Sequence, residues 1–63
     1  MTKNTKTIIE TMETFNPYRN HDDLETYKKI WDAVQTFRQL GLIPEKEFDI
    51  IWEFDNKLFK ESM

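Results

Sequence analysis

The chain has 63 residues and a formal net charge of −3, and 38% of its residues are hydrophobic, 14% aromatic and 33% charged. The absence of cysteine and the presence of one histidine argue against disulfide, thiolate and structural zinc chemistry. Interspersed acids and bases with a slight acidic excess argue against nucleic-acid binding, and no apolar run approaches the roughly 18 residues of a membrane-spanning helix.

Residues 1–6 are polar and charged, and we expect them to be frayed. Because no apolar stretch follows these charges, they predict no signal peptide. We therefore expect a soluble, cytoplasmic protein.

A short helix over residues 7–15 is the first predicted element. Thr7 and Glu10 match a capping box, with threonine as the cap and glutamate at the third position. Asn16-Pro17 ends the helix, because the residue before proline avoids the α region. A helix this short is not stable alone in water, so it is expected to dock on the rest of the chain. Its apolar stripe consists of Ile8, Met12 and Phe15, with Ile9 on the flank.

The second predicted helix covers residues 23–40. Its start is predicted near Asn20 or Asp22, and Asp22, followed by Glu25 three residues later, offers a carboxylate cap. Arg38 projects into the apolar arc near the end of this helix, where we expect an ion pair with Glu47 across the following joint. The arc consists of Leu24, Tyr27, Ile30, Trp31, Val34 and Phe37.

The segment His21-Asp22-Asp23 could be written as a metal or acid–base cluster. Nothing else in the chain supplies the remaining ligands of such a site. We interpret the segment as a helix-capping loop with an exposed histidine.

Residues 40–44 predict a sharp joint between the second and third helices. Gly41, the only glycine, follows the last periodic residue, where a left-handed residue is needed. Leu42 is then placed to pack back on Phe37, the apolar contact that accompanies a Schellman motif. Pro44 fits the first position of the next helix, where its missing N–H is no loss. Because the joint is short, its helices are predicted to be antiparallel neighbours.

The third predicted helix covers residues 44–60. Its apolar face consists of Phe48, Ile51, Trp52, Leu58 and Phe59, and it is widened by Ile50 and Phe54. The widened face covers about 200° of the helix circumference, whereas a surface helix typically needs a little over about 100°. Ile50 and Phe54 therefore need a cover, which could be the first helix, a second copy of the chain or a different protein.

Asp55 lies near the middle of the apolar face of the third helix. As an interface anchor, its carboxylate would be ringed by apolar side chains and aimed at a basic group of a partner. Alternatively it has an internal partner, such as the Tyr27 hydroxyl, the Trp31 indole or a lysine, because a buried unpaired carboxylate is too costly to persist. The interface interpretation predicts that Asp55→Ala weakens partner binding without unfolding the protein.

Residues 40–48, Leu-Gly-Leu-Ile-Pro-Glu-Lys-Glu-Phe, resemble the short C-terminal domain (SHOCT) family. That family has a leucine-bearing helix, then Gly-Ile-Ile-Thr-Glu-Glu-Glu-Phe, then a second helix. Pro44 replaces its usual threonine cap, and the helix that follows is aromatic where the family is usually lysine-rich. The resemblance extends over residues 27–60 and implies a small helical hairpin that mediates interaction. The matching positions are Gly41, Ile43, Glu45, Glu47 and Phe48, with a conservative match at Leu42.

A second resemblance is to sporulation-type aspartyl-phosphate phosphatases, which are short helical hairpins with a Ser-Gln-Glu-Leu-Asp signature. Glu53-Phe54-Asp55 resembles the last three positions of this signature. Ile51 and Trp52 stand where the family has serine and glutamine, so we do not carry the activity over.

Together these patterns predict a single all-α domain, a three-helix unit in which a short N-terminal helix docks on a long antiparallel hairpin. Because we find no catalytic, cofactor-binding or metal motif, we interpret the chain as a non-enzymatic protein–protein interaction module or small regulator. Such a chain most easily acts by blocking or bridging a larger protein. Small phage or mobile-element inhibitors of the anti-CRISPR or anti-restriction type are similar to it in size and class, which is an analogy and not a property of its residues. The alternatives are a structural homodimer and a degenerate phosphatase-like hairpin. The predicted partner-binding residues are Ile50, Ile51, Trp52, Phe54, Asp55 and Phe59.

Overall fold

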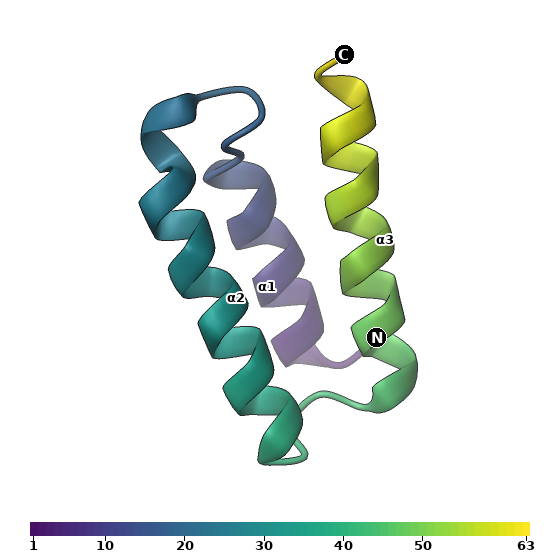
Figure 1. Cartoon of the computed structure of the whole chain (residues 1–63). Helices are drawn as coiled ribbons and strands as arrows, with labels where there is room; N and C mark the ends of the chain where they lie inside the picture. Colours follow the sequence, from purple (N-terminus) through teal and green to yellow (C-terminus); the bar gives the residue numbers. More distant parts are fainter.

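A computed structural model describes residues 1–63 and contains three α-helices and no strand. The helices are α1 (Lys3–Thr14), α2 (Leu24–Gln39) and α3 (Glu45–Glu61). Figure 1 shows α2 and α3 running in opposite directions, with α1 behind the space between them and the N-terminus beside the start of α3. The predicted all-α three-helix unit is therefore confirmed.

The start of α1 differs from the prediction, because the helix begins at Lys3 and is capped by Thr2 instead of Thr7. The Thr2 hydroxyl accepts the backbone N–H of Thr5 at 3.4 Å. The Glu47 carboxylate of α3 accepts hydrogen bonds from the Thr2 backbone N–H at 2.7 Å and from the Thr2 hydroxyl at 3.0 Å. The expectation of a frayed N-terminal segment was wrong, because a carboxylate distant in sequence binds and orders its first residues.

The start of α2 also differs in its cap. A 3-10 turn over His21–Asp23 precedes the helix, and the Asn20 side chain accepts the Asp22 backbone N–H at 3.1 Å. The Asn20 side chain thus caps this 3-10 turn, and Asp23, the N-cap residue of α2 itself, makes no side-chain capping hydrogen bond. The predicted carboxylate cap of Asp22 is therefore absent. The bounds of α2 and α3 lie within one residue of the predicted ranges.

All three helices contribute to the core, and α1 holds them together, because its backbone lies closer to α2 and to α3 than these two lie to each other. The first helix therefore docks on its own hairpin, as expected from its length. Phe15, predicted in the apolar stripe, is 37% exposed because it lies at the helix end. Ile43 of the joint is 2% exposed and enters the core, a role that the sequence pattern did not reveal. The core residues are Ile8, Met12, Tyr27, Ile30, Val34, Ile43, Phe48, Ile51 and Leu58.

The joint after α2 is a Schellman motif, as predicted. Gly41 has φ +76°, its N–H bonds the Arg38 carbonyl at 3.1 Å, and the Leu42 N–H bonds the Phe37 carbonyl at 2.8 Å. Leu42 nevertheless stays 45% exposed, and its neighbour Ile43 is the residue that anchors the joint.

Charges at the start of α3 pair differently from the prediction. Pro44 is the N-cap and not the first helical residue, so α3 begins at Glu45. The Arg38 guanidinium binds the Glu45 carboxylate in a fork, with Nε–Oε1 at 3.0 Å and Nη2–Oε2 at 3.3 Å. The expected pair with Glu47 is absent because Glu47 binds Thr2 instead.

Candidate functional site

Aromatic side chains line the seam where α3 faces α2. The Trp31 and Trp52 rings pack across the seam at a 39° tilt with centroids 4.5 Å apart, and Phe48 meets Trp52 edge-on at 6.4 Å. Tyr18, in the loop before α2, contacts Tyr27 at 6.0 Å and Phe59 at 5.4 Å, both edge-on. Such offset and edge-to-face pairs hold each ring in a defined orientation. We call this set the aromatic seam; it consists of Tyr18, Tyr27, Trp31, Phe48, Trp52 and Phe59.

Helical spacing explains why α3 presents these rings together. Phe48, Trp52 and Phe59 lie at i, i+4 and i+11, which places them on one side of the helix. Asp55 occupies i+7 of the same series, between Trp52 and Phe59. On α2, the side that faces the seam carries Leu24, Tyr27, Trp31 and Arg38.

Asp55 has internal hydrogen-bond partners, as the second of its two interpretations predicted. Its Oδ1 accepts hydrogen bonds from the Tyr27 hydroxyl at 2.5 Å and from the Tyr18 hydroxyl at 3.0 Å. Burial, followed by the hydrogen bond to Asp55, raises the pKa of Tyr27 well above its ordinary value and raises that of Tyr18 as well. Both tyrosines are therefore held as neutral donors to one carboxylate oxygen.

Tyr18 is the residue of this candidate site that sequence reasoning missed. The connector after α1 is fixed by an Asn16 side chain that accepts the Tyr18 backbone N–H at 2.9 Å, and Pro17 is buried. The signal that could have found it is the Asn-Pro-Tyr run, since asparagine followed by proline favours a defined turn. Which helix the ring would meet does not follow from that run.

The structure separates the predicted partner-binding residues into three groups. Trp52 and Phe59 are 46% and 48% exposed on the aromatic seam, with the half-buried Asp55 between them. Ile51 is 0% exposed, so its assignment as a partner-binding residue was wrong. Its side chain is a member of the hydrophobic core.

The third group, Ile50 and Phe54, lies on the opposite flank of α3. These residues follow Glu47 at i+3 and i+7, and Glu47 contacts α1. Phe54 packs against the core and carries the Lys57 ammonium 5.7 Å from its ring centroid, whereas Ile50 remains 37% exposed. The hydrophobic core thus covers Phe54 in part, and Ile50 stays exposed.

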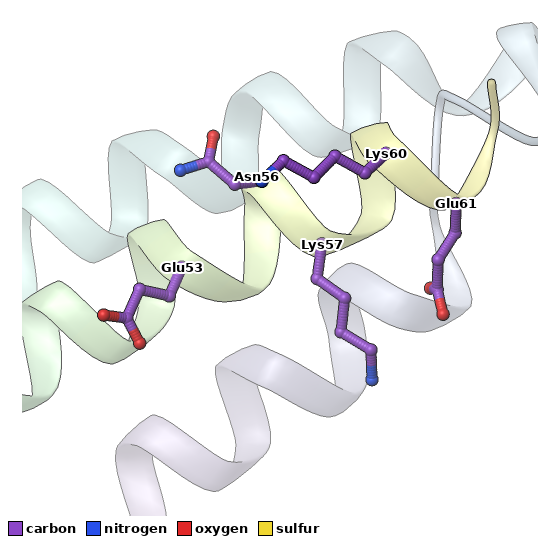
Figure 2. A pocket seen from close by; sticks show the side chains of 5 residues that line it. All are labelled: Glu53, Asn56, Lys57, Lys60 and Glu61. Carbon is purple, nitrogen blue, oxygen red and sulfur yellow. The ribbon is translucent and has the colours of Figure 1, made fainter.

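The concave features of the molecule lie away from the aromatic seam. Figure 2 shows the larger hollow, an open depression on the outer surface of α3 with no hydrophobic lining residue. No group of three His, Asp or Glu side chains could hold a metal ion, and no helix is long and apolar enough to cross a membrane. The larger hollow is lined by Glu53, Asn56, Lys57, Lys60 and Glu61.

Comparison with known proteins adds no relative, because the chain matches no family model, no curated protein and no solved structure. The interpretation of the aromatic seam therefore depends on its geometry and chemistry.

Proposed function

We propose that this protein is a non-enzymatic interaction module that docks the aromatic seam onto a larger protein. The observation that carries this proposal is the exposure of two large aromatic side chains, Trp52 at 46% and Phe59 at 48%, on one side of α3. Full burial of a large apolar side chain contributes about 1.5–3 kcal/mol, so covering both exposed halves would contribute about 2 kcal/mol to binding. Aromatic residues of this kind often dominate the binding energy of an interface.

The exposed rings are also held in place before any partner arrives. Trp52 packs on Trp31, and Phe59 meets Tyr18 edge-on. Ordering a flexible side chain on binding costs about 0.5–1.5 kcal/mol, and rings already packed on neighbours largely avoid this cost. A pre-organised aromatic surface on a small helical scaffold suits a regulator that blocks or bridges its target, such as a phage or mobile-element inhibitor of a host protein. The hairpin resemblance described above is consistent with such an interaction role.

A structural homodimer is the second candidate, and the exposed Ile50 favours it. Ile50 and the half-buried Phe54 form a separate apolar flank that a second copy could cover. In that case the dimer would close through α1 and α3, while the aromatic seam on the other flank would stay free.

The phosphatase-like alternative needs polar groups beside the aspartate. The two positions before Glu53 carry Ile51, which is buried, and Trp52. In addition, Asp55 Oδ1 is engaged by two tyrosine hydroxyls. Turnover of phosphorylated receiver domains would overturn the interaction proposal.

The proposal is tested by comparing two variants of α3 in molar-mass and affinity-capture measurements. Light scattering after size exclusion, over a wide concentration range, establishes whether the chain self-associates. Affinity capture from the cells that produce the protein is then performed with the wild type, Trp52→Ala and Ile50→Ala. We expect a specific partner that Trp52→Ala loses and Ile50→Ala retains. A dimer at all concentrations that Trp52→Ala disrupts would instead assign the seam to self-association.

A further inference from the structure

The aromatic seam contains a carboxylate oxygen without a partner. Asp55 Oδ1 accepts both tyrosine hydroxyls, but Asp55 Oδ2 makes no hydrogen bond. The only ion pair in the chain joins Arg38 and Glu45, so no cation compensates Asp55. No buried side-chain oxygen lacks a hydrogen bond, which means that Asp55 Oδ2 is reached by solvent. This oxygen is thus a negative group open to a ligand between two exposed aromatic rings.

The other end of the seam shows which group fits such a setting. There the Arg38 guanidinium lies 4.3 Å from the Phe48 ring centroid and at the same time donates two hydrogen bonds to the Glu45 carboxylate. A guanidinium can satisfy a carboxylate and stack on an aromatic face at once, which an ammonium does less well. Around Asp55 the carboxylate and the aromatic faces are present, but the guanidinium is missing.

The edge of α3 beside Phe48 and Trp52 adds further negative charge, whereas beside Phe59 the same edge carries Lys60. Glu45, Asp49 and Glu53 lie at i, i+4 and i+8, so they form one row next to Phe48 and Trp52. Asp49 and Glu53 are exposed and have no ion-pair partner. On the opposite rim, α2 carries Lys28, Asp32 and Gln35, so the charge on that rim is mixed.

From these observations we infer that the seam docks an arginine-bearing amphipathic helix of another protein, and this inference rests on the interaction function proposed above. An arginine of that helix binds Asp55 Oδ2 and lies between Trp52 and Phe59. Its apolar side chains cover both rings, and further basic residues face Asp49 and Glu53. The seam from Phe48 to Phe59 rises about 16 Å along α3, the length of about three helical turns.

The two tryptophans of the chain, Trp31 and Trp52, both belong to the seam, so intrinsic fluorescence reports its occupancy. The probes are three tryptophan-free helical peptides of about 16 residues with one identical leucine face. Their flanks carry arginine, glutamate or serine. We expect the arginine peptide to bind at least about tenfold more tightly than the glutamate peptide, and to weaken as salt screens the charges.

Matched variants locate the effect on the seam. Asp55→Asn keeps an oxygen acceptor for the tyrosines but removes the charge, and we expect it to weaken the arginine peptide by about tenfold. Glu10→Gln removes the same charge from the exposed side of α1 and should leave binding unchanged. Ile50→Ala, on the opposite flank of α3, should also leave it unchanged.

The outcomes separate this inference from the function on which it rests. If the wild type binds all three peptides equally and Trp52→Ala binds none of them, arginine recognition is overturned and the docking function stands. Failure of every peptide to bind would also overturn the inference, and retention of the cellular partner by Trp52→Ala would overturn the docking function itself. A salt-independent affinity of the wild type for the arginine peptide would count against charge recognition without any variant.

Discussion

Removing the carboxylate of Asp55 should destabilise the protein more than any other single aspartate substitution in α3. Asp55→Ala leaves the hydroxyl of Tyr27 without its acceptor, and Tyr27 is only 4% exposed. The change also removes the acceptor of Tyr18, which is less buried and can turn its hydroxyl toward water. The loss therefore falls mainly on one buried hydrogen bond to a charged group.

The size of the expected loss of stability in Asp55→Ala follows from these contacts. A hydrogen bond to a charged group contributes about 1.5–3 kcal/mol, and the more exposed bond from Tyr18 adds about 0.5 kcal/mol. Alanine recovers roughly 0.5 kcal/mol because it favours the helix more than aspartate does. The net loss is about 1.5–3 kcal/mol, against a total stability of about 3–9 kcal/mol for a chain of this length. The thermal midpoint should fall by about 6–24 °C.

Thermal and urea unfolding followed by circular dichroism measure this loss, with Asp49→Ala as the matched control. Asp49 lies on the same helix, is exposed and makes no side-chain hydrogen bond, so its substitution should change stability by less than about 0.5 kcal/mol. A double-mutant cycle of Asp55→Ala with Tyr27→Phe should give a coupling of about 1–2 kcal/mol. Equal stability of the two alanine variants, or zero coupling in the cycle, would refute the structural role of Asp55.

Four further substitutions, at three positions, test the fold through pH and backbone geometry. Because burial and the Asp55 hydrogen bond raise the pKa of Tyr27 above its ordinary 10.0, its contribution is present below pH 10 and is lost as the pH rises further. Tyr27→Phe should flatten this alkaline loss in midpoints measured against pH. Hydrogen bonds from the Thr5 and Thr2 side chains and the Thr2 backbone lower the pKa of Glu47 below its ordinary 4.5. Its contribution is therefore present above pH 4.5 and is lost as the pH falls through the lowered value, and Glu47→Gln should remove that acid-sensitive part. Gly41 has φ +76° and open space around the position of a Cβ, so Gly41→Ala should lower the free energy of unfolding by about 1–2 kcal/mol through the backbone alone. A loss of stability no greater than that of an exposed helical substitution would contradict this. Urea unfolding measures that loss, and Gly41→Asn should lose less than Gly41→Ala because asparagine tolerates the left-handed region.

Much of the fold could be predicted from the chain because its signals are local. The helical spacing of apolar residues, the single glycine at the joint and the proline after it depend on neighbours within a few positions. The joint formed the predicted Schellman bonds around Gly41, and α2 and α3 ended within one residue of expectation. The tyrosine partner of Asp55 followed from the antiparallel register of the hairpin, once the cost of burying an unpaired carboxylate was considered.

The tertiary structure alone decided the features that depend on residues distant in sequence. The start of α1 depends on Glu47 binding Thr2, the second donor to Asp55 is Tyr18, and Arg38 is left to pair with Glu45. Adjacent residues of one apolar helix face also separated, since Ile51 is fully buried and Trp52 is nearly half exposed. A periodic pattern identifies the apolar side of a helix, but how far around that side a neighbour reaches depends on where the other helices dock. In this protein α1 packs against both other helices and covers one flank of α3, which leaves the aromatic seam open.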